Sequence, residues 1–244
     1  MSAPTSFDLA RRGARLAGLG YVASIVAGLF VTTVAGGNFT AWGDPAATAQ
    51  NLLANERLFR LGLVAELVMA GFVGLLTGGC YLALRSVSPT LATLGLVFRT
   101  VDTALVTVVV AAKLMALKAL SGEGAMSAFS EAQRQGLSLF FAELHDEYVY
   151  LPLVFIGLGG LSYFAAFYRS RLVPRWLSAW GLFTYASVLV GGCVVLVSPE
   201  HWRLVQLSFL PGGAFEFLAG LWLLAIGIGT TGAGGGVREA GETP

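Results

Sequence analysis

The chain has few charged residues. Only 12% of its 244 residues are Asp, Glu, Lys or Arg, whereas 56% are hydrophobic, and the mean hydropathy is +0.74. Soluble domains carry about 25% charged residues, so this composition excludes an ordinary water-soluble fold. The net charge is +1 and the arginines are scattered without a long basic run, so nothing points to a nucleic-acid partner.

Cysteine and histidine are also scarce, with two of each. In the topology predicted below, Cys80 and Cys193 fall near opposite membrane faces, so we expect two unpaired packing residues and no disulfide. His145 and His201 cannot supply a haem with two axial histidines, because His201 falls in a loop. Phosphate-binding glycine loops, serine nucleophile elbows and Cys/His metal quartets are absent. The sequence therefore leaves the cofactor unknown and leaves open whether the protein is an enzyme.

Long apolar runs dominate the chain. Several have about the twenty residues needed to cross a hydrocarbon layer of roughly 30 Å. We predict an all-α polytopic membrane protein, with six transmembrane helices in one bundle over residues 16–229. The predicted spans are residues 16–35, 60–84, 90–117, 137–168, 176–197 and 204–229. Residues 1–15 are expected to form a cytoplasmic lead and residues 230–244 a disordered cytoplasmic tail.

Some residues predict local features of these helices. Asp44 before Pro45 is typical of a helix N-cap and first turn, so we expect a short surface helix over 45–55. Pro152 predicts a kink in the fourth span, and Lys113 is expected to extend its side chain to the headgroups. Two seams of small residues predict close helix contacts: Ala70, Gly74 and Gly78 in the second span, and Thr103, Thr107 and Ala111 in the third.

The basic residues of the loops predict an orientation. Eight lie on the side of the termini and four on the other side. The first group is Arg11, Arg12, Arg15, Arg85, Arg169, Arg171, Arg175 and Arg238, and the second is Arg57, Lys118, Arg134 and Arg203. The positive-inside rule therefore predicts that both termini are cytoplasmic. We expect the bilayer to be a bacterial inner (plasma) membrane.

Ionisable residues inside apolar spans are costly and mark candidate sites. Counting 1.5 Å per residue along each helix gives Glu66 in the second span and Asp102 in the third similar depths in the outer half of the bundle. We therefore predict one outward-facing ligand-binding or proton-relay pocket formed by Glu66, Arg99, Asp102, His145 and Glu216. Its predicted outer rim is Arg60, Glu143, Asp146 and Glu147.

The chemistry of these residues has alternatives. Arg99 and Asp102 share a helix face, and they form either a structural ion pair or a site in which Arg99 holds an anionic ligand. Arg60 is expected to pair with Glu56 four residues earlier. His145 could be satisfied by a neighbouring carboxylate, accept a proton, or bind a metal together with Glu66 and Glu216. One histidine with carboxylates suits a hard metal or non-haem iron, but no paired-histidine motif supports a metal.

Four stretches carry a resemblance to a known family: NLLANERLFRLGLVAELVMA from residue 51, LVFRTVDTAL, FAELHDEYVYLPLVFIGLGGL and PGGAFEFLAGLWLLAIG. From about residue 17 to 229, the chain resembles a bacterial multi-pass family catalogued as domain of unknown function 4386. The motifs of the family correspond here to Asn55, Arg60, Glu66, Arg99, His145 and Glu216. The family often has an aspartate where Glu66 stands. The resemblance implies the six-helix fold and no particular substrate.

Three functional hypotheses follow. The first is a non-enzymatic protein that binds or transports a small solute in the pocket, with proton coupling through His145 and the carboxylates. The second is an intramembrane metalloenzyme that uses Glu66, His145 and Glu216. The third is an accessory or sensory subunit of a larger membrane complex. Besides the lipid bilayer, the expected partners are thus a small solute, further copies of the chain in a homo-oligomer, or other membrane proteins.

Overall fold

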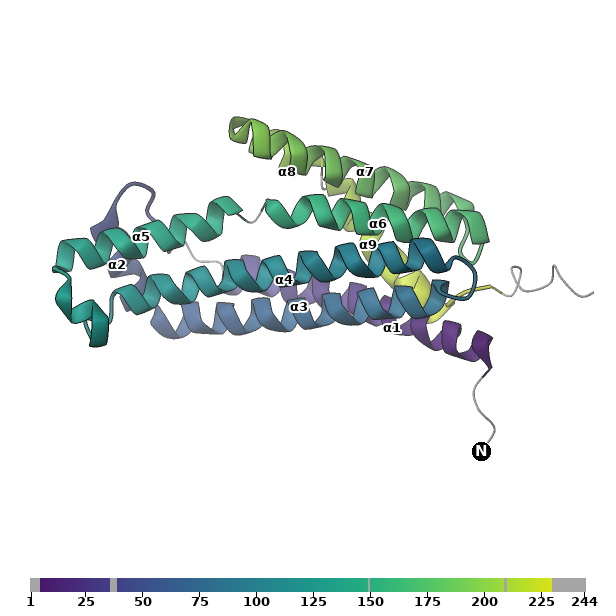
Figure 1. The fold of residues 1–244 in the computed structure, drawn as a ribbon, viewed down its shortest axis with the longest axis horizontal. Coiled ribbons are helices and arrows are strands. Elements are labelled where there is room, and N and C mark those ends of the chain that lie inside the picture. The colour runs from purple at the N-terminus through teal and green to yellow at the C-terminus, as the bar shows by residue number, and fades with distance from the viewer. Residues whose placement is uncertain (1–4, 36–38, 149, 209, 230–244) are drawn as a thin grey trace, which may run out of the picture.

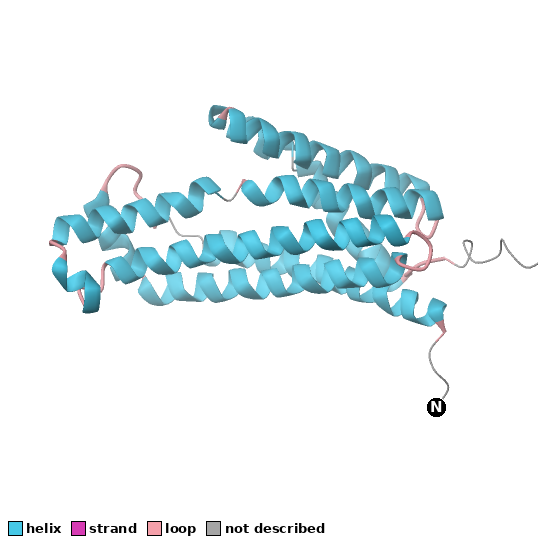
Figure 2. Cartoon of the chain, in the orientation of Figure 1, coloured by secondary structure: helices cyan, strands magenta, loops and turns pink. Residues whose placement is uncertain are grey.

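The structure is a computed structural model that describes residues 5–35, 39–148, 150–208 and 210–229. These residues form helices and turns and contain no strand, as Figure 2 shows. The α-helices are α1 (Ser6–Phe30), α2 (Pro45–Ala54), α3 (Glu56–Leu84), α4 (Pro89–Ala119), α5 (Glu131–Tyr148), α6 (Leu151–Ser170), α7 (Arg175–Val197), α8 (Trp202–Ser208) and α9 (Leu210–Ala225). A π-helical turn (Val31–Ala35) extends α1, and 3₁₀ turns occur at Gly124–Ala128 and Pro199–His201.

Six stretches of the described chain are long and apolar enough to cross a membrane, which confirms the predicted all-α multi-pass fold. They are Ser6–Thr33, Glu56–Leu84, Pro89–Ala119, Leu151–Ser170, Arg175–Val197 and Val205–Ala225. The first helix begins at Ser6, earlier than the predicted residue 16, because Thr5 and Asp8 form a capping box there. Both ends of the described chain lie at one end of the bundle (Figure 1), where the backbone N–H of Gly229 donates to the carbonyl of Leu172. The opposite end is called the distal end below.

The predicted fourth span, residues 137–168, is wrong as a single helix. The chain forms α5, then a turn at Tyr150, then α6, and both helices pack along α4. Pro152 lies in the first turn of α6, where its missing N–H costs nothing, whereas inside a continuous helix its ring would clash with the preceding turn. Only Leu151–Ser170 qualifies as the membrane span. In the sixth span, Pro211 likewise lies in the first turn of a helix, because α9 begins at Leu210.

The bundle has two cores. The main core joins α1, α3, α4, α6, α7 and α9, and includes Tyr21, Cys80, Tyr163, Phe164, Tyr185 and Phe215. The distal core joins α2, α3, α4 and α5, and consists of Leu52, Phe59, Leu63, Val110, Ala116, Leu117 and Ala142. With 29 and 31 residues, α3 and α4 are about 43 and 46 Å long, which exceeds a hydrocarbon layer of roughly 30 Å. Helices α2 and α5 pack where α3 and α4 extend beyond the other spans (Figure 1).

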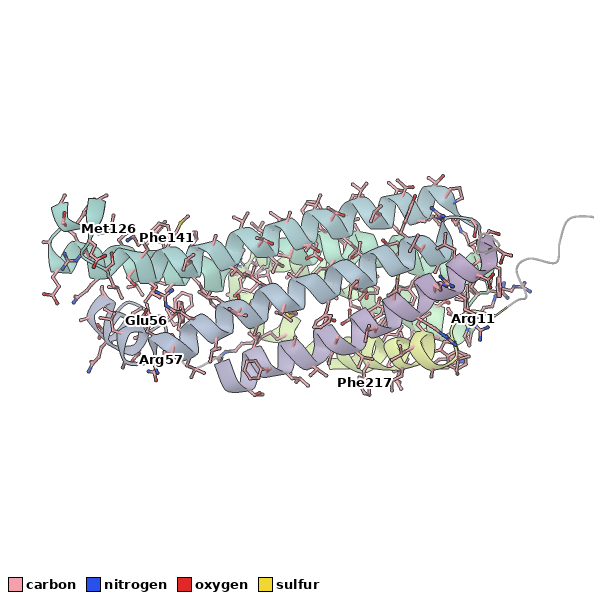
Figure 3. The ribbon with its side chains drawn as sticks, turned by 90° about the horizontal axis from the view of Figure 1, so that it is seen from below. Arg11, Glu56, Arg57, Met126, Phe141 and Phe217 are labelled. Atoms are coloured by element: carbon pink, nitrogen blue, oxygen red, sulfur yellow. The ribbon has the colours of Figure 1, made fainter. Side chains whose placement is uncertain are left out.

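The distal end collects the short elements of the chain. Asp44 caps α2 by accepting a hydrogen bond from the backbone N–H of Ala47, as the sequence predicts. Figure 3 shows Met126, Phe141 and Glu56 at this end, far from Arg11 near the N-terminus. Cys80 is buried and Cys193 is exposed, and both are free cysteines in the structure.

Glycines let α1 lie directly against α3 and α9. A Cβ added to Gly79 would lie 2.4 Å from the backbone N of Ala17, and one added to Gly18 would lie 2.4 Å from the backbone N of Leu224. The predicted seam through Gly74 and Gly78 is wrong, because a Cβ at either position meets nothing within 4 Å. Gly79 follows Gly78 by about 100° of rotation around the helix, and that rotation turns it toward α1. The seam predicted in the third span also fails at Thr107, which is exposed.

Candidate functional site

The centre of the site is an ion pair on α4. The Arg99 Nη1 lies 2.9 Å from the Asp102 Oδ2, and the two residues are only 7% and 1% exposed. Their spacing of three residues brings them to one helix face, as the sequence predicts. The aliphatic stem of Arg99 passes α6 at Gly159, where an added Cβ would lie 2.6 Å from the Arg99 Cγ. The guanidinium therefore reaches the interior of the bundle because α6 has no side chain at this position.

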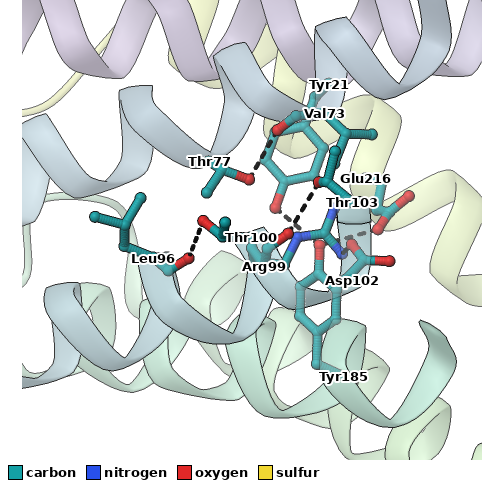
Figure 4. A network of polar contacts seen from close by, with 10 residues as sticks. All are labelled: Tyr21, Val73, Thr77, Leu96, Arg99, Thr100, Asp102, Thr103, Tyr185 and Glu216. Carbon is teal, nitrogen blue, oxygen red and sulfur yellow. Dashed lines mark hydrogen bonds and ion pairs between the residues drawn. The ribbon is translucent and has the colours of Figure 1, made fainter. Parts of the chain in front are cut away.

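Two tyrosines and a second carboxylate lie close enough to Arg99 to interact with it electrostatically. The Tyr185 hydroxyl of α7 donates a hydrogen bond of 2.9 Å to the Glu216 Oε1 of α9. The Tyr21 hydroxyl of α1 lies 2.8 Å from the Tyr185 hydroxyl, and it must be the donor, because Tyr185 has already given its only hydroxyl proton to Glu216. Glu216 also interacts electrostatically with Arg99 and Asp102. Figure 4 shows these five residues, the central cluster, converging from α1, α4, α7 and α9.

The charges of the central cluster do not balance. It contains one guanidinium, Arg99, and two carboxylates, Asp102 and Glu216, while the two tyrosine hydroxyls are neutral. With both carboxylates ionised the cluster carries a net charge of −1. An uncompensated charge inside a membrane protein costs several kcal/mol. One bound proton or one monovalent cation would neutralise the cluster.

A cavity of about 250 Å³ borders the cluster at Glu216. It lies between the first two turns of α6, the middle of α7 and the first half of α9, and its lining residues are Leu153, Ile156, Thr184, Val188, Gly212, Gly213 and Glu216. The walls are therefore apolar except for one carboxylate and one hydroxyl. Gly212 and Gly213 leave room on the α9 side, because they place no side chain in this space.

Several polar atoms at the site have hydrogen-bonding capacity left over. Thr184 is 5% exposed, and its Oγ1 has no hydrogen-bond partner among the described residues. Thr103 and Ser187, in contrast, bond to the carbonyls four residues earlier. The buried Arg99 Nε and Asp102 Oδ1 are likewise without a hydrogen bond in the described part of the chain. Buried polar atoms normally find partners, so these atoms mark a place where water or a ligand can bind.

Glu66 does not belong to the central cluster, so the prediction of a single site is wrong. Its Oε1 lies 2.6 Å from the Lys113 Nζ, and Lys113 follows Asp102 by eleven residues on α4, which is about 16 Å along the helix. The depth of Glu66 was misjudged because α3 and α4 extend beyond the thickness of the bilayer. Lys113, expected to reach the headgroups, instead pairs with Glu66 beside the distal core.

The predicted rim lies at the distal end as well. Arg60 pairs with Glu56 at 2.8 Å, as expected, and the Glu143 Oε1 accepts a hydrogen bond from the backbone N–H of Gly43. The backbones of residues 145–147 form the end of α5, but the side chains of His145, Asp146 and Glu147 lie outside the described part of the structure.

Glu66 and Glu216, two of the three expected metal ligands, belong to different clusters. The side chain of His145, the third, lies outside the described part of the structure. No group of three His, Cys, Asp or Glu side chains that could hold a metal occurs among the described residues.

Tyr21, Tyr185 and Thr184 are site residues that were not predicted from the sequence. A signal for the tyrosines was present, because both lie well inside apolar runs, whereas tyrosine in membrane proteins gathers at the interfaces. A buried tyrosine hydroxyl needs a hydrogen-bond partner, and mid-span tyrosines therefore point to a polar group on another helix. The free hydroxyl of Thr184 had no such signal, because membrane helices satisfy most hydroxyls locally.

Comparison with known families shows which family the chain resembles. The family described as domain of unknown function DUF4386 matches residues 16–227, and the chain belongs to this family. No curated protein matches the chain. No solved structure matches it either.

Proposed function

We propose that this member of the DUF4386 family binds a small solute inside the membrane, in the cavity beside Glu216, and that binding is linked to the gain or loss of one proton. The supporting observation is that the central cluster has one more carboxylate than it has cations, and that it borders a cavity. A purely structural ion pair would need only Arg99 and one carboxylate. The additional carboxylate, Glu216, faces the space that a solute could enter.

The hydrogen bonds suit this role. Tyr185 and Tyr21 hold Glu216 at the cavity wall, so its position is fixed before any ligand arrives. Arg99 and Asp102 neutralise each other. The remaining negative charge, which one proton can cancel, belongs to the cluster as a whole and reaches the cavity through Glu216. Transport would require the cavity to open to both sides in turn, and binding is the step that the cluster itself supports.

We also propose that the distal end faces outward in a bacterial inner membrane, because the arginine-rich loops lie with the termini. Leu153 and Ile156 belong to the first two turns of α6, on the distal side of the membrane region. In this orientation the cavity lies in the outward half of the bilayer. We propose that this cavity takes the place of the outward-facing pocket predicted from the sequence, without Glu66 and with the side chain of His145 outside the described part of the structure.

Infrared difference spectroscopy on the protein in lipid vesicles tests the proton linkage. Between acid and alkaline buffer, we expect a carboxylic-acid C=O band to disappear as the cluster loses its proton. Glu216→Gln should abolish this band, whereas Glu143→Gln, which changes a carboxylate at the distal loop, should leave it. A wild-type spectrum without a titrating buried carboxyl band would refute the proposed function.

A further inference from the structure

We infer that the cavity beside Glu216 binds a small lipophilic organic cation, such as a primary alkylammonium, in exchange for the proton of the central cluster. This inference rests on the proposed function and specifies the substrate class of the same site. The ammonium group binds Glu216, and the hydrocarbon part of the cation packs against the cavity walls formed by α6 and α7.

The lining of the cavity determines the sign of the ligand charge. Glu216 and Thr184 are the two residues with polar side chains that line the cavity, whereas Arg99 is not among its lining residues. A ligand therefore meets oxygen atoms that accept hydrogen bonds, and an ammonium group donates three of them. An anion would meet Glu216 first and would be repelled.

The walls determine the rest of the ligand. Leu153, Ile156 and Val188 are apolar, and Gly212 and Gly213 add no polar side chain. Binding pockets are typically about 300–1,000 Å³, and this cavity of about 250 Å³ falls just below that range. The ligand is therefore small, with one cationic group and a short apolar body.

Charge balance links the cation to the proton. The charged groups around Glu216 are Arg99 and Asp102 from α4, and the neutral hydroxyls are Tyr185 from α7 and Tyr21 from α1. On the α6 side, the lining residues are the uncharged Leu153 and Ile156. The protonated cluster is neutral, and a bound ammonium restores neutrality only after that proton leaves. Each cation that enters thus releases one proton to the buffer.

The test uses hexylammonium chloride as the probe and the full chain in lipid nanodiscs. Titration calorimetry in two buffers with different ionisation enthalpies gives both the affinity and the number of protons released, and empty nanodiscs correct for partition into lipid. Wild type should bind hexylammonium and release about one proton per bound cation. Where the cluster is protonated before binding, the affinity should rise about tenfold per pH unit, since one proton competes with one cation.

Variants locate the binding to this cavity. Glu216→Gln should weaken hexylammonium binding at least tenfold and abolish proton release, and Thr184→Val should weaken binding several-fold while proton release persists. Glu143→Gln should behave like wild type. If Glu216→Gln does not fold, Glu216→Asp replaces it, since this change keeps the charge but withdraws it from the cavity, and the same weakening is expected.

Hexanoate and hexanol separate the possible failures. If hexanoate binds with proton uptake, the ligand class is wrong although proton-linked binding stands. Equal binding of hexanol and hexylammonium would show an unselective apolar cavity and overturn the inference. If no probe binds but the infrared band of the cluster still titrates, the cation is refuted and the proton linkage survives. If the band is also missing, both proposals fail.

Discussion

Gly79→Ala tests the closest helix contact of the fold. The added Cβ would lie 2.4 Å from the Ala17 N, 2.6 Å from the Gly13 O and 2.8 Å from the Ala17 Cα. All three are backbone atoms, so no side-chain rotation can relieve the clash. Ordinary contact begins at 3.4 Å, and α1 must therefore move by about 1 Å, the difference between these distances.

The cost of this movement is large because α1 is held on two sides. Gly18 lies equally close to the backbone of α9, so α1 cannot move away from α3 without disturbing a second tight contact. Overpacking in a core costs about 1–3 kcal/mol, and we expect the upper part of this range, about 3 kcal/mol. For a chain of this size each kcal/mol shifts the melting temperature by roughly 2–4 °C, which gives a decrease of about 6–12 °C.

The assay is thermal unfolding followed by tryptophan fluorescence in one detergent. Gly74→Ala is the matched control, because it makes the same chemical change in the same helix and its Cβ meets nothing within 4 Å. Alanine is the better helix former by about 0.5–1 kcal/mol, so the control should melt at or slightly above the wild-type temperature. Equal melting temperatures for the two variants would refute the direct packing of α1 on α3.

Two further predictions concern buried polar groups. Glu66→Gln leaves the Lys113 ammonium without its carboxylate and should lower the free energy of unfolding by about 3 kcal/mol. The double variant with Lys113→Met should recover most of this loss, and no recovery would contradict a direct pair. Tyr185→Phe removes the hydroxyl that donates to Glu216 and accepts from Tyr21, and should lower the free energy of unfolding by about 1–3 kcal/mol. The control Tyr168→Phe, at an exposed position, should have little effect. Equal effects of the two variants would contradict the hydrogen bonds from Tyr21 through Tyr185 to Glu216.

The sequence predicts the six-span fold because hydrocarbon thickness imposes a length on each apolar run. It also predicts the Arg99–Asp102 pair and the Glu56–Arg60 pair, since both depend only on helix periodicity. Helix ends were less predictable. In the sequence, residues 137–148 look like the start of the apolar run of the fourth span. In the structure they belong to α5, which packs on α4 and α2 outside the membrane span Leu151–Ser170.

The membership of the site could be predicted only in part. Arg99, Asp102 and Glu216 were identified by the cost of burying charge, and the structure brings them together. Glu66 has the same depth as Asp102 only if each helix is counted from a membrane boundary at its predicted end, whereas the register between α3 and α4 pairs Glu66 with Lys113. Contacts between helices, such as those of Tyr21 and Tyr185, depend on rotation and register that a single sequence does not reveal.

The distal core has a consequence for the order in which the protein assembles during synthesis. Its residues come from α2, α3, α4 and α5, so Phe59, Leu63 and Val110 lack part of their packing until α5 has been synthesised and packs on α4. The first three spans can enter the bilayer one by one, but the distal ends of α3 and α4 stay exposed to water during that interval. The distal end therefore completes its fold only after α5, the helix that precedes the fourth span, has been made.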